Sequence, residues 1–193
     1  MDTCLEKALL TRIREGDDTG FETLVAAHSP RLLSLAWRLV GVREDAEEIT
    51  QEAFLRLHRS IGDFRGDSSV ATWLYRTVTR LAIDHLRRRK LRERIFFFRR
   101  SNEEADPMDF VPDPAASPGE RYFAGEIRQR IDRAMQRLSA RQRVVFTLRH
   151  HEEMPLREIA AVLGLEEGTV KAHLHRAVRV LRRELKDLQG ESS

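Results

Sequence analysis

The sequence contains a single cysteine, Cys4, and no long run of uncharged apolar residues. One cysteine excludes an intramolecular disulfide and any zinc site built from several cysteines. The apolar stretches fall short of the roughly 20 residues that cross a bilayer, and the amino terminus is charged where a secretory signal is apolar. These absences predict a cytoplasmic protein that is not inserted in a membrane.

Strand-like alternation is also missing, and proline is scarce outside one segment. Four of the six prolines fall within residues 101–119, which contain no lysine or arginine. Elsewhere, apolar residues recur every three or four positions, which is the period of a helix. We therefore predict an all-α protein of two small helical domains, residues 1–92 and 121–193, joined by a flexible, acidic, proline-rich linker over 93–120.

The net charge of +3 hides a segregated distribution. Residues 1–67 carry −4 and residues 68–100 carry +8, followed by −6 over 101–120 and +5 over 121–193. Most of the positive charge is arginine, and a basic face rich in arginine suits a phosphate backbone. Charge alone favours nucleic acid only slightly over a solvated surface.

The apolar period and the capping residues predict where the helices lie. The second expected helix begins near Phe21. Ser29 and Pro30 form the pattern of an N-cap and first helical position, so we expect this helix to restart or kink there and to continue to Val40. Ser139 and Gln142 form a capping box that begins a later helix. The apolar triplet 96–98 either docks on the first domain, which we favour, or contacts a partner. The other expected helices cover about 5–14, 45–58 and 71–91, one that ends near 138, and two short ones at the end.

Residues 155–185 have the pattern of a helix-turn-helix. Pro155 sets the first turn of one helix, Gly164 supplies a left-handed end, and a second helix starts near Gly168. Four apolar residues of the second helix share one face and are expected to be buried: Val170, Leu174, Ala177 and Leu181. The opposite face would enter a major groove of DNA. The residues of this face and of the first turn of the helix are Gly168, Thr169, Lys171, Ala172, His175, Arg176 and Arg179. The alternative is an ordinary helical hairpin with a basic surface.

Three segments in order resemble the extracytoplasmic function (group IV) sigma factors of bacterial RNA polymerase. Residues 45–61, DAEEITQEAFLRLHRSI, are similar to that family's region 2.2, and residues 64–88 to its regions 2.3 and 2.4. Residues 158–177, EIAAVLGLEEGTVKAHLHRA, are similar to region 4.2. A lone helix-turn-helix occurs in many regulators, whereas the three segments together point to this family.

The resemblance implies a sigma factor that binds core polymerase, recognises −10 and −35 promoter elements and promotes promoter melting, in a stress or envelope response. In the family the 2.2 helix grips the polymerase β′ subunit, and an acidic helix is a poor ligand for DNA. The implied partners are the polymerase β′ and β subunits, promoter DNA and an anti-sigma factor. The residues that match the polymerase-binding surface are Asp45, Glu48, Gln51, Glu52 and Leu55.

The resemblance also implies a −10 site, in which a flipped base needs a stacking surface and polar edges. Trp73 either stacks on a base or belongs to the core, which we favour. Arg80 stands where the family often has asparagine, so the −10 preference is open. The residues expected to contact −10 DNA are Asp63, Phe64, Arg65, Arg76, Thr79, Arg80, Arg87 and Arg88.

The matching linker of the family passes through the polymerase along the path that RNA later takes. The six carboxylates of residues 101–120 either imitate nucleic acid there or only keep a tether soluble. The helix-turn-helix departs from the family at His173 and His175, where arginine or a bulky residue is common. It also departs at Glu166 and Glu167, where serine or proline is common. These acidic side chains suit the helix dipole but would repel a nearby phosphate, so the promoter sequence is open.

Two other classes of function are disfavoured. An enzyme lacks support because His173 and His175 point about 200° apart on a helix and cannot share a metal. No nucleophile, base and orienting acid can be assembled, so we expect no catalytic residue, metal or cofactor. A ligand-sensing regulator would have no need for the acidic 45–58 helix followed by a basic helix. Such a regulator would bind duplex DNA unaided, commonly as a dimer.

Overall fold

The computed structural model describes residues 3–64, 68–99 and 129–186, and these residues are helical with short connections. Residues 129–137 form a helix that precedes α6. The predicted all-α class is confirmed. The remaining elements are α1 (Thr3–Arg14), α2 (Asp18–Val40), α3 (Arg43–Ser60), the 3-10 turn η1 (Ile61–Asp63), α4 (Val70–Arg99), α6 (Ala140–His150), α7 (Leu156–Leu163) and α8 (Glu167–Glu184).

The sequence pattern predicted a restart or a kink of the second helix at Ser29 and Pro30, and the structure has no restart there. The helix begins at Asp18, where the Asp17 carboxylate accepts a hydrogen bond of 2.9 Å from the Thr19 amide, and runs through Pro30. Proline removes one backbone hydrogen bond from a helix. Leucines on both sides of Pro30 are buried, and their burial holds the two parts of α2 in one helix.

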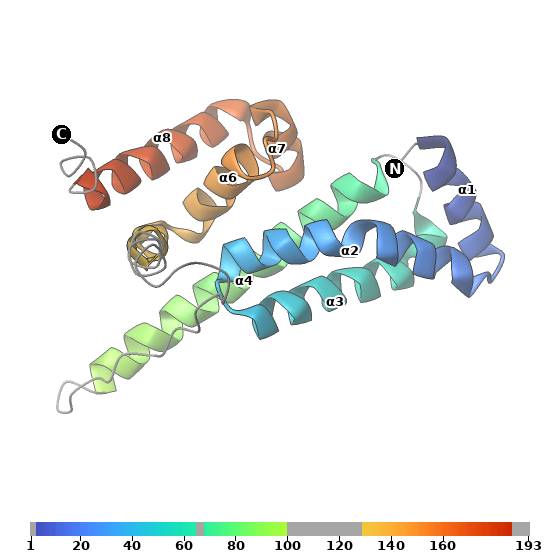
Figure 1. Cartoon of the computed structure of the whole chain (residues 1–193), viewed down its shortest axis with the longest axis horizontal. Helices are drawn as coiled ribbons and strands as arrows, with labels where there is room; N and C mark the ends of the chain where they lie inside the picture. Colours follow the sequence, from blue (N-terminus) through green and yellow to red (C-terminus); the bar gives the residue numbers. More distant parts are fainter. Residues whose placement is uncertain (1–2, 65–67, 100–128, 187–193) are drawn as a thin grey trace, which may run out of the picture.

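The fourth helix is longer than the sequence pattern indicated. It runs from Val70 to Arg99, eight residues past the expected end at Leu91, so the expected domain boundary at 92 falls within it. Its carboxyl-terminal turns extend beyond the other helices in Figure 1. The triplet 96–98 continues this helix, but its side chains lie outside the described residues.

The core is shared between the two halves of the chain. Helices α2, α3 and α4 lie side by side with α1 at one end, and α6 and α7 pack against α4 (Figure 1). Leu39 and Leu74 of the first half belong to the same buried cluster as Leu148 and Ile159 of the second half. A smaller cluster joins residues 129–138 to α8 through Ala134, Leu138, Ala177 and Leu181. The two predicted helical units therefore form a closed arrangement with a common apolar core.

Polar contacts centred on Glu152 connect the two halves. The Glu152 side chain is 7% exposed, and its Oε2 accepts hydrogen bonds of 2.8 Å from Arg31 Nε and 2.6 Å from the Tyr75 hydroxyl. The Arg31 guanidinium also lies 5.6 Å from the centre of the Tyr75 ring. Burial and the neighbouring Glu152 carboxylate raise the pKa of Tyr75 above its usual range. Tyr75 therefore stays protonated, and its hydroxyl donates a hydrogen bond to the Glu152 carboxylate.

Two further arginines reach across to backbone carbonyls of the other half. Arg143 of α6 donates from Nη1 to the carbonyl of Leu39, at 3.0 Å, in the last turn of α2. Arg76 of α4 donates from Nη2 to the carbonyl of Ala161, at 3.1 Å, near the end of α7. A cation at the carboxyl-terminal end of a helix is attracted by the helix dipole, so both contacts favour the closed arrangement.

We expect Glu152→Ala to lower the free energy of unfolding by about 2 kcal/mol, because it leaves the buried Tyr75 hydroxyl without its acceptor. Urea unfolding followed by circular dichroism measures this change. Tyr75→Phe should lose about half as much, since it removes one of the two hydrogen bonds to Glu152. Glu22→Ala removes an exposed carboxylate of α2 and is the matched control. Equal unfolding midpoints for Glu152→Ala and Glu22→Ala would contradict the stabilising role of Glu152 between the two halves.

Candidate nucleic-acid and partner interfaces

Helices α7 and α8 form the expected helix-turn-helix. Gly164 adopts φ 62°, in the left-handed region, and the Leu165 amide donates to the Ala160 carbonyl at 3.0 Å. A residue with a side chain is strained in this conformation, which explains the glycine. Helix α8 begins at Glu167, and Val170, Ala177 and Leu181 are buried as expected, while Leu174 is partly buried.

The outward face of α8 is open to solvent in the closed arrangement. Lys171 forms an ion pair of 3.2 Å with Glu167, one turn earlier, so part of its charge is neutralised within the helix. Arg176 and Arg179 form no ion pair among the residues that the structure describes. Ala172 is partly buried, and the exposed candidates are Gly168, Thr169, Lys171, His175, Arg176 and Arg179.

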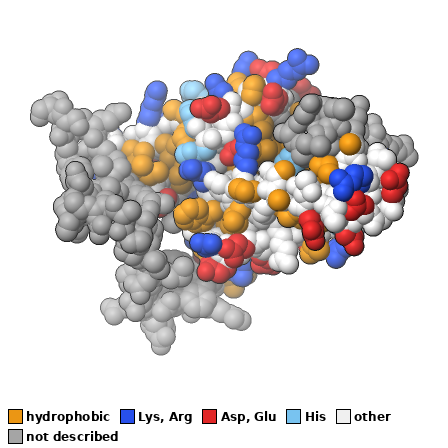
Figure 2. Space-filling model, turned by 45° about the vertical axis from the view of Figure 1, so that its right-hand side comes forward, with side chains coloured by type: hydrophobic (Ala, Val, Ile, Leu, Met, Phe, Trp, Pro, Cys, Tyr) orange, Lys and Arg blue, Asp and Glu red, His pale blue; other side chains and the backbone are white. Residues whose placement is uncertain are grey.

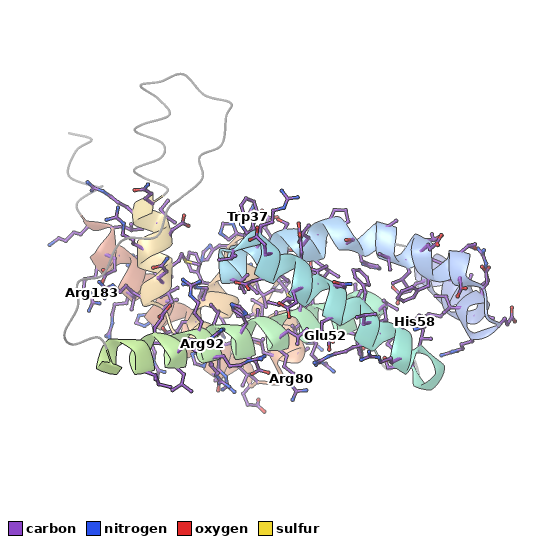
Figure 3. All side chains as sticks on the ribbon, turned by 90° about the horizontal axis from the view of Figure 1, so that it is seen from below. Trp37, Glu52, His58, Arg80, Arg92 and Arg183 are labelled. Carbon is purple, nitrogen blue, oxygen red and sulfur yellow. The ribbon has the colours of Figure 1, made fainter. Side chains whose placement is uncertain are left out.

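The acidic helix α3 presents only part of the predicted polymerase-binding set outward. Glu48, Gln51 and Leu55 are exposed, and Leu55 is 44% exposed although it is apolar. Glu52, labelled in Figure 3, is half-buried and accepts a 2.7 Å hydrogen bond from Arg56. Asp45 turns toward α4, where its Oδ2 lies 3.3 Å from His85 Nε2. The freely exposed part of this surface is therefore smaller than the sequence suggested.

A groove between α2 and α3 adds apolar residues that the sequence reasoning missed. It has a volume of about 380 Å³ and brings Val25 and Leu33 of α2 beside Phe54 and Leu55 of α3. Val25 and Leu33 are visible in the sequence as apolar residues of α2, but which of its apolar residues stay uncovered depends on how α3 packs. Apolar patches between acidic and basic side chains are also visible on the face drawn in Figure 2. An exposed apolar groove of this kind is suited to a partner helix.

The segment between α3 and α4, which contains the −10 candidates Asp63, Phe64 and Arg65, is attached to α1 at both ends, which the sequence did not reveal. Arg14 donates to the Ile61 carbonyl at 3.4 Å and also to the carbonyl of Phe64. Glu6, which is 8% exposed, accepts a 2.7 Å hydrogen bond from the amide of Val70 at the start of α4. A carboxylate at a helix amino terminus is stabilised by the free amides there.

Two of the candidate −10 residues are buried. Phe64 is 9% exposed and belongs to the core, so its ring is not open to a base in this arrangement. Thr79 is 1% exposed, and its hydroxyl donates to the Tyr75 carbonyl at 2.7 Å, which leaves it unable to reach DNA. Trp73 is half-buried against the core, as favoured. The side chain of Asp63 and the whole of Arg65 lie outside the described residues.

The basic candidates on α4 differ in their surroundings. Arg80, Arg87 and Arg88 are exposed, and Figure 3 shows Arg80 and Arg92 along the length of this helix. Arg76 is also exposed but is bound to the carbonyl end of α7. Helix α4 therefore offers a row of cationic side chains whose amino-terminal member is already engaged by the second half of the chain.

The described residues, 3–64, 68–99 and 129–186, contain no group of three histidine, cysteine, aspartate or glutamate side chains that could hold a metal ion. Within the same residues, none of the helices is long and apolar enough to cross a membrane.

A helix-turn-helix, a basic helix and an acidic helix with an apolar groove define a DNA-binding protein that also docks on a partner protein. Residues 24–92 match the family described as Sigma-70 region 2, and residues 128–181 match Sigma-70, region 4. The RNA polymerase sigma-H factor of Pseudomonas aeruginosa is 30% identical over 187 residues, which cover 97% of each chain. The ECF RNA polymerase sigma factor SigW of Bacillus subtilis is 29% identical over 94% of this chain and 97% of the relative.

Solved structures show the same fold. The structure of CnrH in complex with the cytosolic domain of CnrY superposes with a TM-score of 0.61 at 21% identity, over 98% of this chain and 99% of that one. The sigma factor RpoE of Bartonella quintana, in complex with the anti-sigma factor NepR, has a TM-score of 0.58 at 22% identity, over 86% of this chain and 96% of that one.

The chain belongs to the sigma-70 family, within its extracytoplasmic function group. It is a transcription initiation factor that binds core RNA polymerase, recognises −10 and −35 promoter elements and promotes promoter melting. The predicted family and function are thereby confirmed, while the roles of individual residues rest on the geometry alone.

Proposed function

We propose that the exposed surfaces of this chain divide the sigma function among three groups of residues. Glu48, Gln51 and Leu55, with the groove between α2 and α3, bind the polymerase. Arg80, Arg87 and Arg88 contact DNA at and upstream of the −10 element. The face of α8 reads the −35 major groove, and the exposure of Arg176 and Arg179 supports this role most directly.

Promoter binding also requires the two halves to separate. Arg76 is a −10 candidate, yet it is occupied by the Ala161 carbonyl, and the helices α6 and α7 cover part of α4. Separation exposes this part of α4 and leaves α8 free to reach the −35 element. The predicted division of the chain into two helical units joined by a linker serves this movement, with the first unit extending along α4 to Arg99 rather than ending at residue 92. We propose the closed arrangement as the form of the unbound protein.

The polymerase performs the chemistry, and this chain has no catalytic activity of its own. It acts in the cytoplasm, where the polymerase and the promoter are located. The relatives CnrH and RpoE were solved with CnrY and NepR, the second of which is an anti-sigma factor. By analogy, an anti-sigma factor binds this chain as well.

Run-off transcription tests the function as a whole. Bacterial core polymerase, with and without the full chain, is given a pool of promoter fragments from the source genome. We expect specific transcripts only when the chain is present, and their aligned start sites identify both promoter elements. If the chain bound duplex DNA alone and no transcript formed, it would act as a conventional regulator instead.

The polymerase-binding face is tested by Leu55→Asp. A carboxylate in the groove has to be desolvated when the partner docks, so we expect at least about a tenfold loss of affinity for core polymerase. Leu91→Asp is the matched control, because Leu91 is 58% exposed on α4, away from the groove. Binding of each variant to immobilised core enzyme measures the affinity, and circular dichroism checks the fold. Equal affinities of the two variants would rule out this face.

The −35 interface is tested by Arg176→Ala in holoenzyme. If Arg176 reads a base, we expect a loss of about 1–3 kcal/mol on the cognate −35 sequence and almost none on a scrambled one. Arg182→Ala removes an exposed arginine from the far end of the same helix and serves as the control. Electrophoretic mobility shifts at one salt concentration measure both affinities. An equal loss on the two DNA sequences would make Arg176 a phosphate contact.

A further inference from the structure

A basic cleft lies at the junction of the two halves, and Arg87 is the one residue that it shares with the three proposed surfaces of the sigma function. It has a volume of about 340 Å³. One wall is the carboxyl-terminal part of α4, and the other is formed by residues 136–143 with His173 of α8. The charged residues that line it are Arg87, Arg89, Lys90, Glu93, Arg141 and Arg143.

The charges within this cleft are not balanced. Five cationic side chains face a single carboxylate, Glu93, which accepts a 3.0 Å hydrogen bond from Arg89. Among the residues that the structure describes, Arg87, Lys90 and Arg141 form no ion pair. Like charges that meet where two domains pack repel each other, so the closed arrangement carries an electrostatic cost at this position.

Arg143 is the most buried of these cations. It is 8% exposed, and among the described residues its guanidinium donates to the carbonyls of Leu39 and Met135, at 3.0 and 3.1 Å. Burial, together with the positive charge of Arg89, lowers the pKa of Arg143 to about 10. The carboxylates of Asp132 and Glu93 oppose this lowering without cancelling it, and among the described residues neither forms an ion pair with Arg143. A buried charge without an ion-pair partner is costly, and an anion in the cleft would reduce that cost.

Neutral polar groups in the cleft could hold the same anion. The Nδ1 atom of His173 is buried without a hydrogen-bond partner among the described residues. Burial, followed by Arg141 and Arg176, lowers the pKa of His173, so the ring is neutral near pH 7 and can donate one hydrogen bond. An unused polar atom inside a cationic cleft points to a ligand with several acceptor oxygens.

We propose that this cleft binds a small soluble anion with several phosphate groups, and that the bound anion fastens the two halves together. Clustered phosphates match the chemistry, since guanidinium groups bind phosphate oxygens through paired hydrogen bonds. The volume is that of a small-molecule pocket. A DNA duplex is too large to enter and would touch only the rim, which is why a small anion is the better occupant.

The regulatory consequence rests on the proposed function. Both halves contribute walls to the cleft, so an anion that occupies it binds the closed arrangement more tightly than the open one. The closed arrangement engages Arg76 and covers part of α4. The anion therefore opposes −10 recognition and favours the unbound sigma factor.

Thermal unfolding of the full chain with sodium tripolyphosphate tests the site, with sodium chloride at equal ionic strength as the reference. We expect a saturable rise of roughly 5 °C in the unfolding midpoint at about 100 times the dissociation constant. The variant Lys90→Glu/Arg141→Glu should lose at least tenfold in affinity. Arg59→Glu/Arg157→Glu reverses two exposed arginines outside the cleft, changes the net charge equally and should keep the wild-type response.

Three results would overturn the proposal. The first is a rise no larger than that in sodium chloride, and the second is an equal response of the two double variants. The third is displacement of tripolyphosphate by a duplex without promoter sequence, which would identify a DNA backbone as the occupant. Neither polymerase nor promoter is present, so a failure here leaves the sigma function intact, and a failed run-off assay leaves the anion site intact.

Discussion

The structure depends on the burial of α4 against two sets of helices. Helices α2 and α3 pack against α4, and so do α6 and α7, although the two sets come from opposite halves of the chain. Leu74 and Val78 are fully buried, and Tyr75 is 7% exposed between them. One helix thus joins the two halves into a single core, and the position of every proposed surface follows from how this helix is covered.

Arginine acts in three ways in this arrangement. On α8 it remains exposed and available to DNA. At the helix junctions, Arg76 and Arg143 are bound to the carbonyl ends of α7 and α2, where the helix dipole replaces a carboxylate. In the cleft, Arg87 and Arg141 form no ion pair among the described residues, so positive potential accumulates there. Arginine retains its charge even when buried. Its neighbours therefore determine whether it stabilises a contact within the chain or remains available to bind an anion.

Much of the helical organisation was predictable because its signals are local. Gly164 and the Ser139–Gln142 capping box act within one turn, and both appear as expected. The expected restart at Pro30 does not occur, because long-range burial outweighs the loss of one hydrogen bond. The prediction also failed to show that Thr79 is buried, since a threonine with a polar group looks accessible until the neighbouring helices are placed.

Most of the helices, their caps, the outward face of α8 and the family of the chain can be inferred from the sequence, because each depends on residues close together in the chain or on whole motifs. Three features appear only once the chain is folded: the core that the two halves share, the attachment of the segment after α3 to Glu6 and Arg14, and the cleft where cations from α4 and α6 meet. These contacts join residues dozens of positions apart. They follow from how the apolar faces of the helices pack, and the periodicity of the sequence does not indicate which faces pack together.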